Sequence, residues 1–182
     1  MTYAICAFDL AFDRECAAVF QREEGMPNGR VYDLRLGADG AFYYHTLDNG
    51  VARFDLFEQA PRWQTCVQAD EPMASNFVST IVEDSSGGIW FAGDDLFRHA
   101  GTDTVEIDLF FGDNAIVSDG NGGIWTLGDR ALFYTLEGAS ESERWNKENG
   151  LRDAAHGGLA LDDQGRVWAG SEGGVSIWDG SS

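Results

Sequence analysis

The chain has 182 residues, of which 43% are hydrophobic and 13% aromatic, so it is long enough and apolar enough to fold around its own core rather than stay disordered. Its 31 acidic residues outnumber its 12 basic residues and give a net charge of −19, which argues against nucleic acids and anionic membranes as partners. The same charge favours a cationic ligand, a basic protein partner, or simply solubility.

The first 24 residues contain two strand-like segments, residues 3–8 and 16–21, and no targeting signal. Charged residues such as Asp9 and Asp13 interrupt the apolar run that a signal peptide needs, and no stretch reaches the roughly 18 apolar residues of a membrane helix. Three cysteines without a CxxC spacing argue against a disulfide framework. We therefore expect a cytoplasmic protein, or a periplasmic one if the sequence is part of a longer sensor.

A short turn that ends in glycine recurs through the rest of the chain, and an aromatic residue stands three positions after each glycine. The glycine–aromatic pairs are Gly40 and Tyr43, Gly87 and Trp90, Gly122 and Trp125, and Gly165 and Trp168. The aromatic residues are 47, 35 and 43 positions apart. A period of about 40 residues with one glycine turn and one aromatic residue per unit is typical of the blades of a β-propeller.

Each unit is predicted to be a meander of three strands followed by an outer strand. The predicted strands are 31–36, 42–45, 51–55 and 63–67; 78–82, 89–92, 96–98 and 105–109; 115–118, 124–127, 131–134 and 143–146; and 158–162, 167–170 and 175–179. The turn glycine is expected to have a positive φ. An aspartate that opens the turn, such as Asp162, is expected to accept hydrogen bonds from backbone N–H groups within it.

The recurring aromatic residue is expected to fill the seam between neighbouring blades, because twisted sheets that pack face to face need a large flat side chain there. The alternative is that one of these rings stacks on a sugar. On this basis the sequence predicts an all-β fold, a β-propeller of about four, or five, four-stranded blades that form a small ring or a partial propeller.

We expect a single domain over residues 1–182. Its parts are a partial blade with closing strands at 1–24 and blades at 25–70, 71–111, 112–149 and 150–182. Residues 16–21 could supply the missing outer strand of the last blade and close the ring. The alternatives are that the chain is part of a longer propeller, or that an open arc leaves two apolar blade faces in water, which favours association with a second copy.

The repeats resemble those of the two-component regulator propeller family. The last copy matches that family's pattern in three successive segments, 150–153, 162–170 and 174–179, and the earlier copies match it at 25–28 and 50–55 and at 72–76 and 84–93. The resemblance implies a propeller from the sensor half of a bacterial regulator that responds to glycan breakdown products. Similar repeats occur in streptogramin lyase, a propeller enzyme.

Ligands of propellers usually bind at the end where the loops leading into the inner strands meet the loops between the second and third strands, here called the mouth. The first set of loops contributes Asn28, Arg30, Asn76, Asp113, Asn114, Arg152 and His156. The second set contributes Asp48, Asn49, Asp94, Asp95, Asp129, Arg130 and Glu172. This acidic rim is suited to a cationic or polyhydroxylated ligand, or to Lys and Arg side chains of a partner, although tight turns also favour Asp and Asn for conformational reasons.

The sequence contains no catalytic or metal-binding motif that would favour an enzyme. His45, His99 and His156 fall in different blades without metal-ligand spacing, and each is expected to be a surface or loop histidine. The Asp-rich turn at 119–122 lacks the register of a calcium loop. We expect no catalytic residue, no metal and no cofactor. A lyase would depend on His156, the histidine that lies closest to the predicted mouth.

We therefore expect a non-enzymatic propeller module that binds a protein or a small polar or cationic ligand at an acidic mouth. The alternatives are a glycan-sensing fragment of a two-component regulator, an acidic inhibitor or immunity protein that binds a basic partner, and a streptogramin-lyase-like enzyme. We expect neither nucleic acid nor membrane as a partner, and a second copy that completes the propeller is a further candidate.

Overall fold

The computed structural model describes residues 5–8, 16–20, 30–46, 50–55, 63–67, 77–101, 103–107, 115–128, 130–139, 141–151, 155–171 and 173–179. All regular elements in these ranges are β-strands, as the sequence predicted. Among the same residues no helix is long and apolar enough to cross a membrane.

Four antiparallel sheets follow one another along the chain, and each is a meander in sequence order. The first contains β3 (Val31–Leu36), β4 (Phe42–Thr46), β5 (Val51–Phe54) and β6 (Trp63–Val67). The second contains β7 (Val78–Glu83), β8 (Ile89–Gly93), β9 (Leu96–Ala100) and β10 (Asp103–Ile107). The third contains β11 (Ala115–Ser118), β12 (Gly123–Gly128), β13 (Ala131–Leu136) and β14 (Glu143–Trp145). The fourth contains β15 (Ala155–Leu161), β16 (Val167–Ser171) and β17 (Gly174–Trp178).

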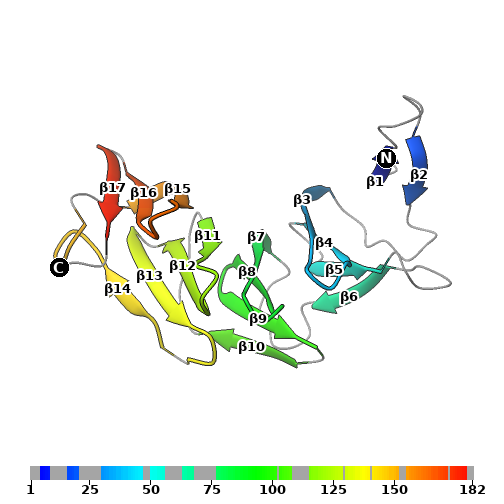
Figure 1. The fold of residues 1–182 in the computed structure, drawn as a ribbon, viewed down its shortest axis with the longest axis horizontal. Coiled ribbons are helices and arrows are strands. Elements are labelled where there is room, and N and C mark those ends of the chain that lie inside the picture. Colours follow the sequence, from blue (N-terminus) through cyan, green and yellow to red (C-terminus); the bar gives the residue numbers. More distant parts are fainter. Residues whose placement is uncertain are drawn as a thin grey trace.

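The four sheets are propeller blades that stand side by side in an open arc (Figure 1). The inner strands β3, β7, β11 and β15 lie on the concave side and contact one another in sequence order. The outer strands β6, β10 and β14 lie on the convex side (Figure 1). We call the blades 1 to 4 in chain order. The described residues form a partial propeller rather than a closed ring.

The predicted strands agree with the observed ones to within a few residues at their ends. The largest difference at an outer strand is in blade 2, where the predicted strand 105–109 lies at Asp103–Ile107. Asp103 and Thr104 pair with Ala100 and His99 across a tight connection, so pairing begins earlier than the β-branched composition suggests.

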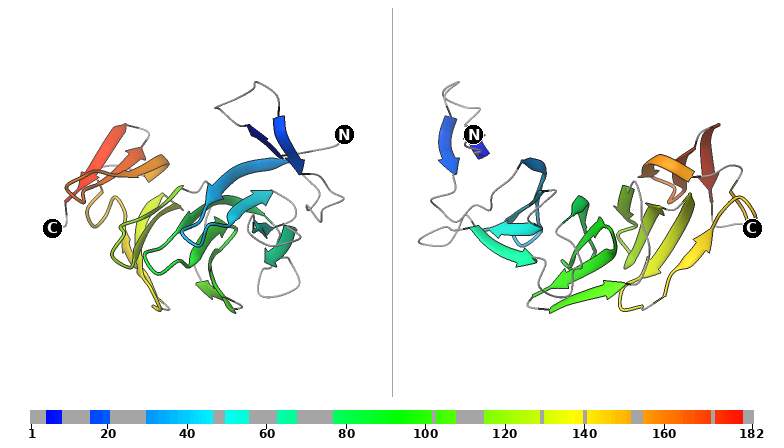
Figure 2. Two further views of the ribbon diagram at one scale, coloured as in Figure 1. Left: turned by 45° about the vertical axis from the view of Figure 1, so that its right-hand side comes forward. Right: turned by 180° about the vertical axis from the view of Figure 1, so that it is seen from behind.

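Two further strands, β1 (Ile5–Phe8) and β2 (Cys16–Phe20), pair with each other as an antiparallel hairpin. The hairpin lies beyond β3, at the end of the arc opposite to β17 (Figure 2). The exchange that would bring β2 against blade 4 and close the ring is therefore not present in this structure. Residues 16–20 find their hydrogen-bond partners in the preceding strand, which is closer in sequence and costs less loop-closure entropy.

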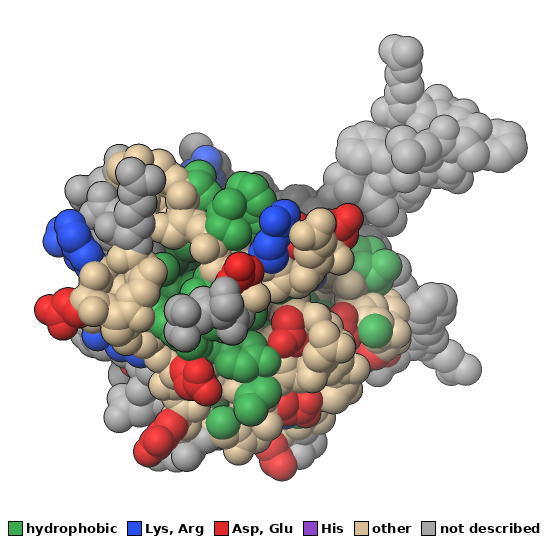
Figure 3. Space-filling model, turned by 60° about the vertical axis from the view of Figure 1, so that its left-hand side comes forward, with side chains coloured by type: hydrophobic (Ala, Val, Ile, Leu, Met, Phe, Trp, Pro, Cys, Tyr) green, Lys and Arg blue, Asp and Glu red, His purple; other side chains and the backbone are tan. Residues whose placement is uncertain are grey.

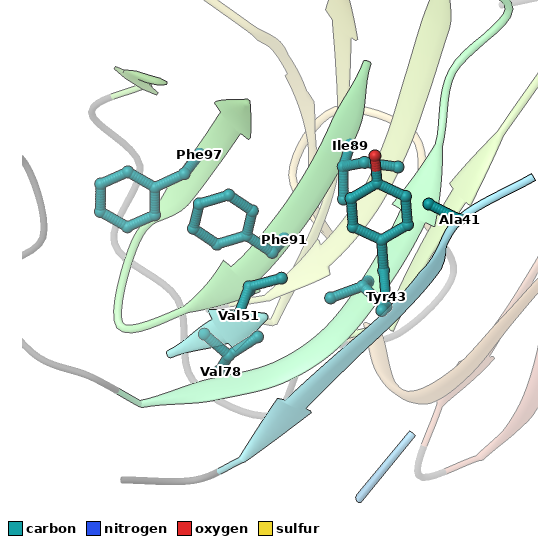
Figure 4. Packing of buried hydrophobic residues seen from close by; sticks show 8 residues of the cluster. Ala41, Tyr43, Val51, Val78, Ile89, Phe91 and Phe97 are labelled. Carbon is teal, nitrogen blue, oxygen red and sulfur yellow. The ribbon is translucent and has the colours of Figure 1, made fainter. Parts of the chain in front are cut away.

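The recurring aromatic residues of the first three blades fill the seams, as predicted. Tyr43 lies in one buried cluster with Ile89 and Phe91 of blade 2 (Figure 4). Trp90 is fully buried with Ile116 and Ile124 of blade 3, and Trp125 is 5% exposed and packs with Val167 and Ala169 of blade 4. Each ring therefore contacts the blade that follows its own, and the core of this protein is a series of seams rather than one central cluster.

Candidate functional site

The strand order determines which ends of the blades form the mouth. Each inner strand runs away from the residues that lead into it and ends at the glycine turn, and the second strand returns to the starting end. The loops leading into the inner strands and the loops between second and third strands therefore lie at one end of the arc. The glycine turns lie at the opposite end.

The structure describes only part of the predicted mouth. Arg30, Asp94, Asp95 and Arg130 lie in its described loops, and the backbone of His156 lies in β15. The other predicted residues are outside the described ranges: Asn28, Asp48, Asn49, Asn76, Asp113, Asn114, Asp129, Arg152 and Glu172. The described rim therefore carries charges of both signs, and the acidic character predicted for the whole rim stays a prediction.

A β-bulge interrupts the inner strand at the mouth end in three of the four blades. The register shifts between Val31 and Asp33 in blade 1, between Val78 and Thr80 in blade 2, and between Ala155 and Leu159 in blade 4. A bulge leaves a residue out of the ladder and turns its side chain, and bulges are frequent next to binding sites. The residues within these three bulges are Tyr32, Ser79 and His156–Gly158.

Tyr32 is the residue that the bulge of blade 1 presents to solvent, with 50% of its surface exposed. Its ring stacks over His45, with the ring centroids 6.4 Å apart and an interplanar angle of 19°. The guanidinium carbon of Arg30 lies 5.9 Å from the centroid of the Tyr32 ring, within the range of a cation–π contact. An arginine, an exposed aromatic ring and a buried histidine are thus stacked at the mouth end of blade 1.

Sequence reasoning found Arg30 in this stack but did not select Tyr32 or His45. Tyr32 stands inside a regular strand pattern, and nothing in the sequence marks the bulge that turns it outward. His45 was expected to be a surface or loop histidine, and this is wrong because its side chain is completely buried in the seam between blades 1 and 2. The one available signal was an aromatic residue two positions after a predicted mouth residue.

His45 is a buried titratable group without a satisfied polar contact. Neither ring nitrogen has a hydrogen-bond partner of good geometry among the described residues. Burial lowers the pKa of His45, while the backbone of Val78 and the charge of Asp33 oppose this shift and Arg35 adds to it. The folded protein therefore holds His45 as the neutral ring.

Leucine is the residue that blade 3 has at the position equivalent to His45, Leu127. Replacing His45 by leucine is expected to make the free energy of unfolding less dependent on pH in the acid range. Because the pKa is lower in the folded state, the unfolded state binds more protons, and stability is lost as the pH falls below the ordinary value of 6.5. One such group contributes a slope of up to about 1.4 kcal/mol per pH unit in this window. Urea unfolding of wild type and His45→Leu across this range measures the difference.

A second histidine, His99, is present in both proteins and also contributes to the pH dependence of stability. Burial lowers the pKa of His99, and the charge of Asp103 opposes this shift. Some acid sensitivity should therefore remain in the variant. A pH dependence identical in the two proteins would show that His45 is protonated equally in the folded and unfolded states.

The glycine turns at the opposite end carry the acidic residues with the most hydrogen bonds. In blade 2, Oδ1 of Asp84 accepts hydrogen bonds from the Ser86 and Gly88 N–H groups and from the Ser86 hydroxyl. Its Oδ2 accepts from Nε1 of Trp90 at 2.8 Å and from Nε of Arg98 at 2.7 Å. Burial raises the pKa of Asp84, but these hydrogen bonds outweigh burial and lower the pKa to about 2.

The other blades contain variants of this network. In blade 4, Asp162 accepts from the Gln164 and Arg166 N–H groups and from the side chains of Arg166 and Trp168, and the Trp168 hydrogen bond is the main cause of its lowered pKa. In blade 3, Asp119 accepts from its turn and from the Tyr134 hydroxyl, which replaces the indole.

Blade 1 has a similar hydrogen-bond network, but its carboxylate comes from a different position of the turn. Gly37 occupies the position of Asp84, and Asp39 accepts from the Ala41 N–H, the Tyr43 hydroxyl and Arg53. The turn glycines have the predicted positive φ, for example +86° at Gly87. The prediction that these aspartates bind backbone N–H groups within the turn is confirmed. In blades 1, 2 and 4 their second oxygen also accepts a hydrogen bond from the recurring aromatic residue.

These aspartates are thus tied to the fold and lie away from the mouth. In the described part of the chain no group of three or more His, Cys, Asp or Glu side chains is placed to hold a metal ion.

Residues 72–95, which contain β7, the following turn and β8, match the family described as "Two component regulator propeller". A search of curated proteins finds no match.

Several solved structures share the fold. The extracellular domain of a putative hybrid two component system from B. thetaiotaomicron aligns with a TM-score of 0.69 at 21% identity, over 87% of this chain and 22% of that one. The extracellular domain of a putative one component system from the same organism aligns with a TM-score of 0.68 at 19% identity, over 88% of this chain and 23% of that one. Virginiamycin B lyase from Staphylococcus aureus aligns with a TM-score of 0.65 at 12% identity, over 98% of this chain and 64% of the lyase.

This chain spans less than a quarter of either sensor domain, and identities of this size establish the fold alone. Sensor domains and an enzyme both appear among the similar structures, so the fold does not decide between binding and catalysis. The match and the shared fold confirm the family resemblance: residues 72–95 match a two component regulator propeller repeat, and the described residues form a partial β-propeller.

Proposed function

We propose that this chain is a ligand-sensing propeller module that binds a polyhydroxylated, glycan-type ligand at its mouth, with Tyr32 as the stacking surface. The observation that carries the proposal is the stack of Arg30, Tyr32 and His45, in which a bulge holds an aromatic ring half exposed at the end where propellers bind ligands. The flat ring offers apolar contact to the face of a sugar, and the guanidinium offers donors to its hydroxyl groups.

The sensor class is favoured by the family match and by the two extracellular sensor domains that share the fold. The same comparison favours an extracytoplasmic location, the periplasmic alternative, over the cytoplasmic one. A catalytic role has weaker support: the three histidines lie in different blades, and His45 is buried with a lowered pKa.

Replacing Tyr32 by alanine is expected to weaken binding by at least about fivefold, because truncating an aromatic anchor of a binding site typically costs more than about 1 kcal/mol. The probe is a panel of neutral oligosaccharides, screened with the wild-type chain and then titrated by calorimetry. Arg30→Ala is expected to weaken binding of the same oligosaccharide by a smaller factor.

Two exposed residues of the same strand serve as matched controls. Leu36→Ala removes an exposed apolar side chain and Arg35→Ala an exposed guanidinium, both toward the glycine-turn end of β3. The controls should bind the oligosaccharide as wild type does. Absence of binding to every neutral oligosaccharide, or equal binding by Tyr32→Ala, would reject the proposal.

A basic protein partner is the second candidate, and the net charge of −19 is the observation that favours it. The two candidates differ in their response to salt. Binding of a neutral glycan should be insensitive to ionic strength, whereas binding of a basic partner to a rim containing Asp94 and Asp95 should weaken strongly as salt is added.

A further inference from the structure

The C-terminal end of the arc exposes apolar side chains to solvent. Val175 and Ile177 of β17 are 60% and 51% exposed, and Trp168 beside them is partly exposed. All three lie on the face of blade 4 that is turned away from blade 3, because Ile177 pairs with Trp168 while Trp178 packs into the seam with blade 3. Figure 3 shows hydrophobic side chains gathered on the molecule as seen from this end, with acidic side chains around them.

The same positions are buried in every other blade. In each blade the third strand has a residue that pairs with the position two residues after the recurring aromatic residue. In blade 4 this residue is Val175. In blades 1 to 3 it is Val51, Leu96 and Leu132, which are 1%, 0% and 0% exposed. Each of these is covered by the blade that follows its own. Blade 4 thus has apolar side chains at the positions that form a seam in the other blades, but no blade among the described residues covers them.

The N-terminal end of the arc has the complementary feature. In each blade the inner strand has a residue that pairs with the position directly after the recurring aromatic residue. In blade 1 this residue is Leu34, and in blades 2, 3 and 4 it is Ile81, Ile116 and Leu159. These three pack against the preceding blade, whereas Leu34 is 38% exposed and its neighbour Leu36 is 62% exposed. Leu34 and Leu36 therefore form one half of a seam, and no blade among the described residues supplies the other half.

We propose that the face of Trp168, Val175 and Ile177 in one copy docks on the face of Leu34 and Leu36 in a second copy, head to tail, and reproduces the seam that the chain already forms three times between its own blades. The occupant is a second copy because the surface that this face is built to contact is present at the other end of the same chain. Such a contact joins two different faces, so further copies can add until the rotation between them closes a ring, or can extend as an open chain if it does not.

Wild type should therefore associate in a concentration-dependent way, measured by sedimentation velocity. Because each copy carries a net charge of −19, association should strengthen as salt screens the repulsion. Val175→Asp, which places a carboxylate in one half of the seam, and Leu34→Asp, which places one in the other half, should each weaken self-association at least tenfold, roughly the effect of one poorly paired buried charge.

Mixing the two variants distinguishes the head-to-tail contact from a symmetric one. Val175→Asp retains an intact N-terminal face and Leu34→Asp retains an intact C-terminal face, so an equimolar mixture should form a one-to-one dimer that grows no further. The control is Val105→Asp, which changes a residue that is 58% exposed on the outer strand β10 and should associate as wild type does. Circular dichroism should show that all three variants keep the wild-type spectrum, since the changed residues are exposed.

Three results would overturn the proposal. The first is a wild-type chain that stays monomeric at every concentration and salt, which would mean that the two faces do not bind each other. The second is a loss of association in only one of the two variants while the other associates as wild type does, which indicates a symmetric contact through one face. The third is association that neither Val175→Asp nor Leu34→Asp weakens, which places the interface elsewhere.

Discussion

Replacing Trp90 by alanine is expected to lower the free energy of unfolding by about 3–5 kcal/mol, the range for removing a fully buried large aromatic side chain. The Trp90 ring is 0% exposed and fills the seam between blades 2 and 3, where it packs with Ile116 and Ile124. The same change removes the indole donor to Asp84. Urea unfolding followed by circular dichroism measures the loss.

The matched control is Trp168→Ala, which removes the same residue type from the same position of the repeat. Trp168 also donates its indole N–H to the aspartate of its turn, but it is only partly buried because no described blade covers its face. Its replacement is expected to cost about 1–2 kcal/mol in a dilute, monomeric sample. Equal losses for the two variants would mean that the seam does not carry the stability.

Replacing Asp84 by alanine is expected to cost about 3–5 kcal/mol, as when one partner is removed from a buried charged pair. Its carboxylate is completely buried and accepts five hydrogen bonds, from Ser86, Gly88, Trp90 and Arg98. Without it the Gly88 N–H and the Trp90 indole N–H lose their acceptor inside the protein. Denaturant unfolding of wild type and variant measures this loss.

The same carboxylate makes a prediction about pH. Because the pKa of Asp84 is about 2 in the folded protein against an ordinary value of 3.8, its contribution is fully present above pH 3.8 and is lost as the pH falls from 3.8 towards 2. Asp84→Ala should lack this acid-sensitive step. The matched variant Asp162→Ala, at the more exposed end of the arc, should be destabilised clearly less. A variant Asp84→Ala that unfolds at the wild-type urea concentration would contradict the assignment.

Much of the fold was predictable because its signals are local. A glycine at the end of a turn, such as Gly87 with its φ of +86°, and an aromatic residue three positions later identify each repeat within a few residues of chain. Alternation of side chains within strands of three to seven residues then gives their approximate bounds. The three covered seams follow from the same repetition.

The candidate site was less predictable. The mouth could be located from strand order. The β-bulge that exposes Tyr32 depends on the register in which β3 pairs with β4, and no residue type in the sequence indicates that register. His45 occupies the same position of its repeat as Ala92 and Leu127, and it is buried because β7 packs against β4. Sequence patterns describe one blade at a time and do not include this contact.

The sequence by itself determined that these segments are strands of propeller blades, since turn chemistry and side-chain alternation act between residues close together in the chain. The tertiary structure alone decided which of the equivalent side chains are buried. Val51, Leu96, Leu132 and Val175 occupy one position of the repeat, yet three are covered and one is in contact with solvent. Burial depends on whether another blade lies against the face, and that is a property of the assembled arc rather than of any repeat within it.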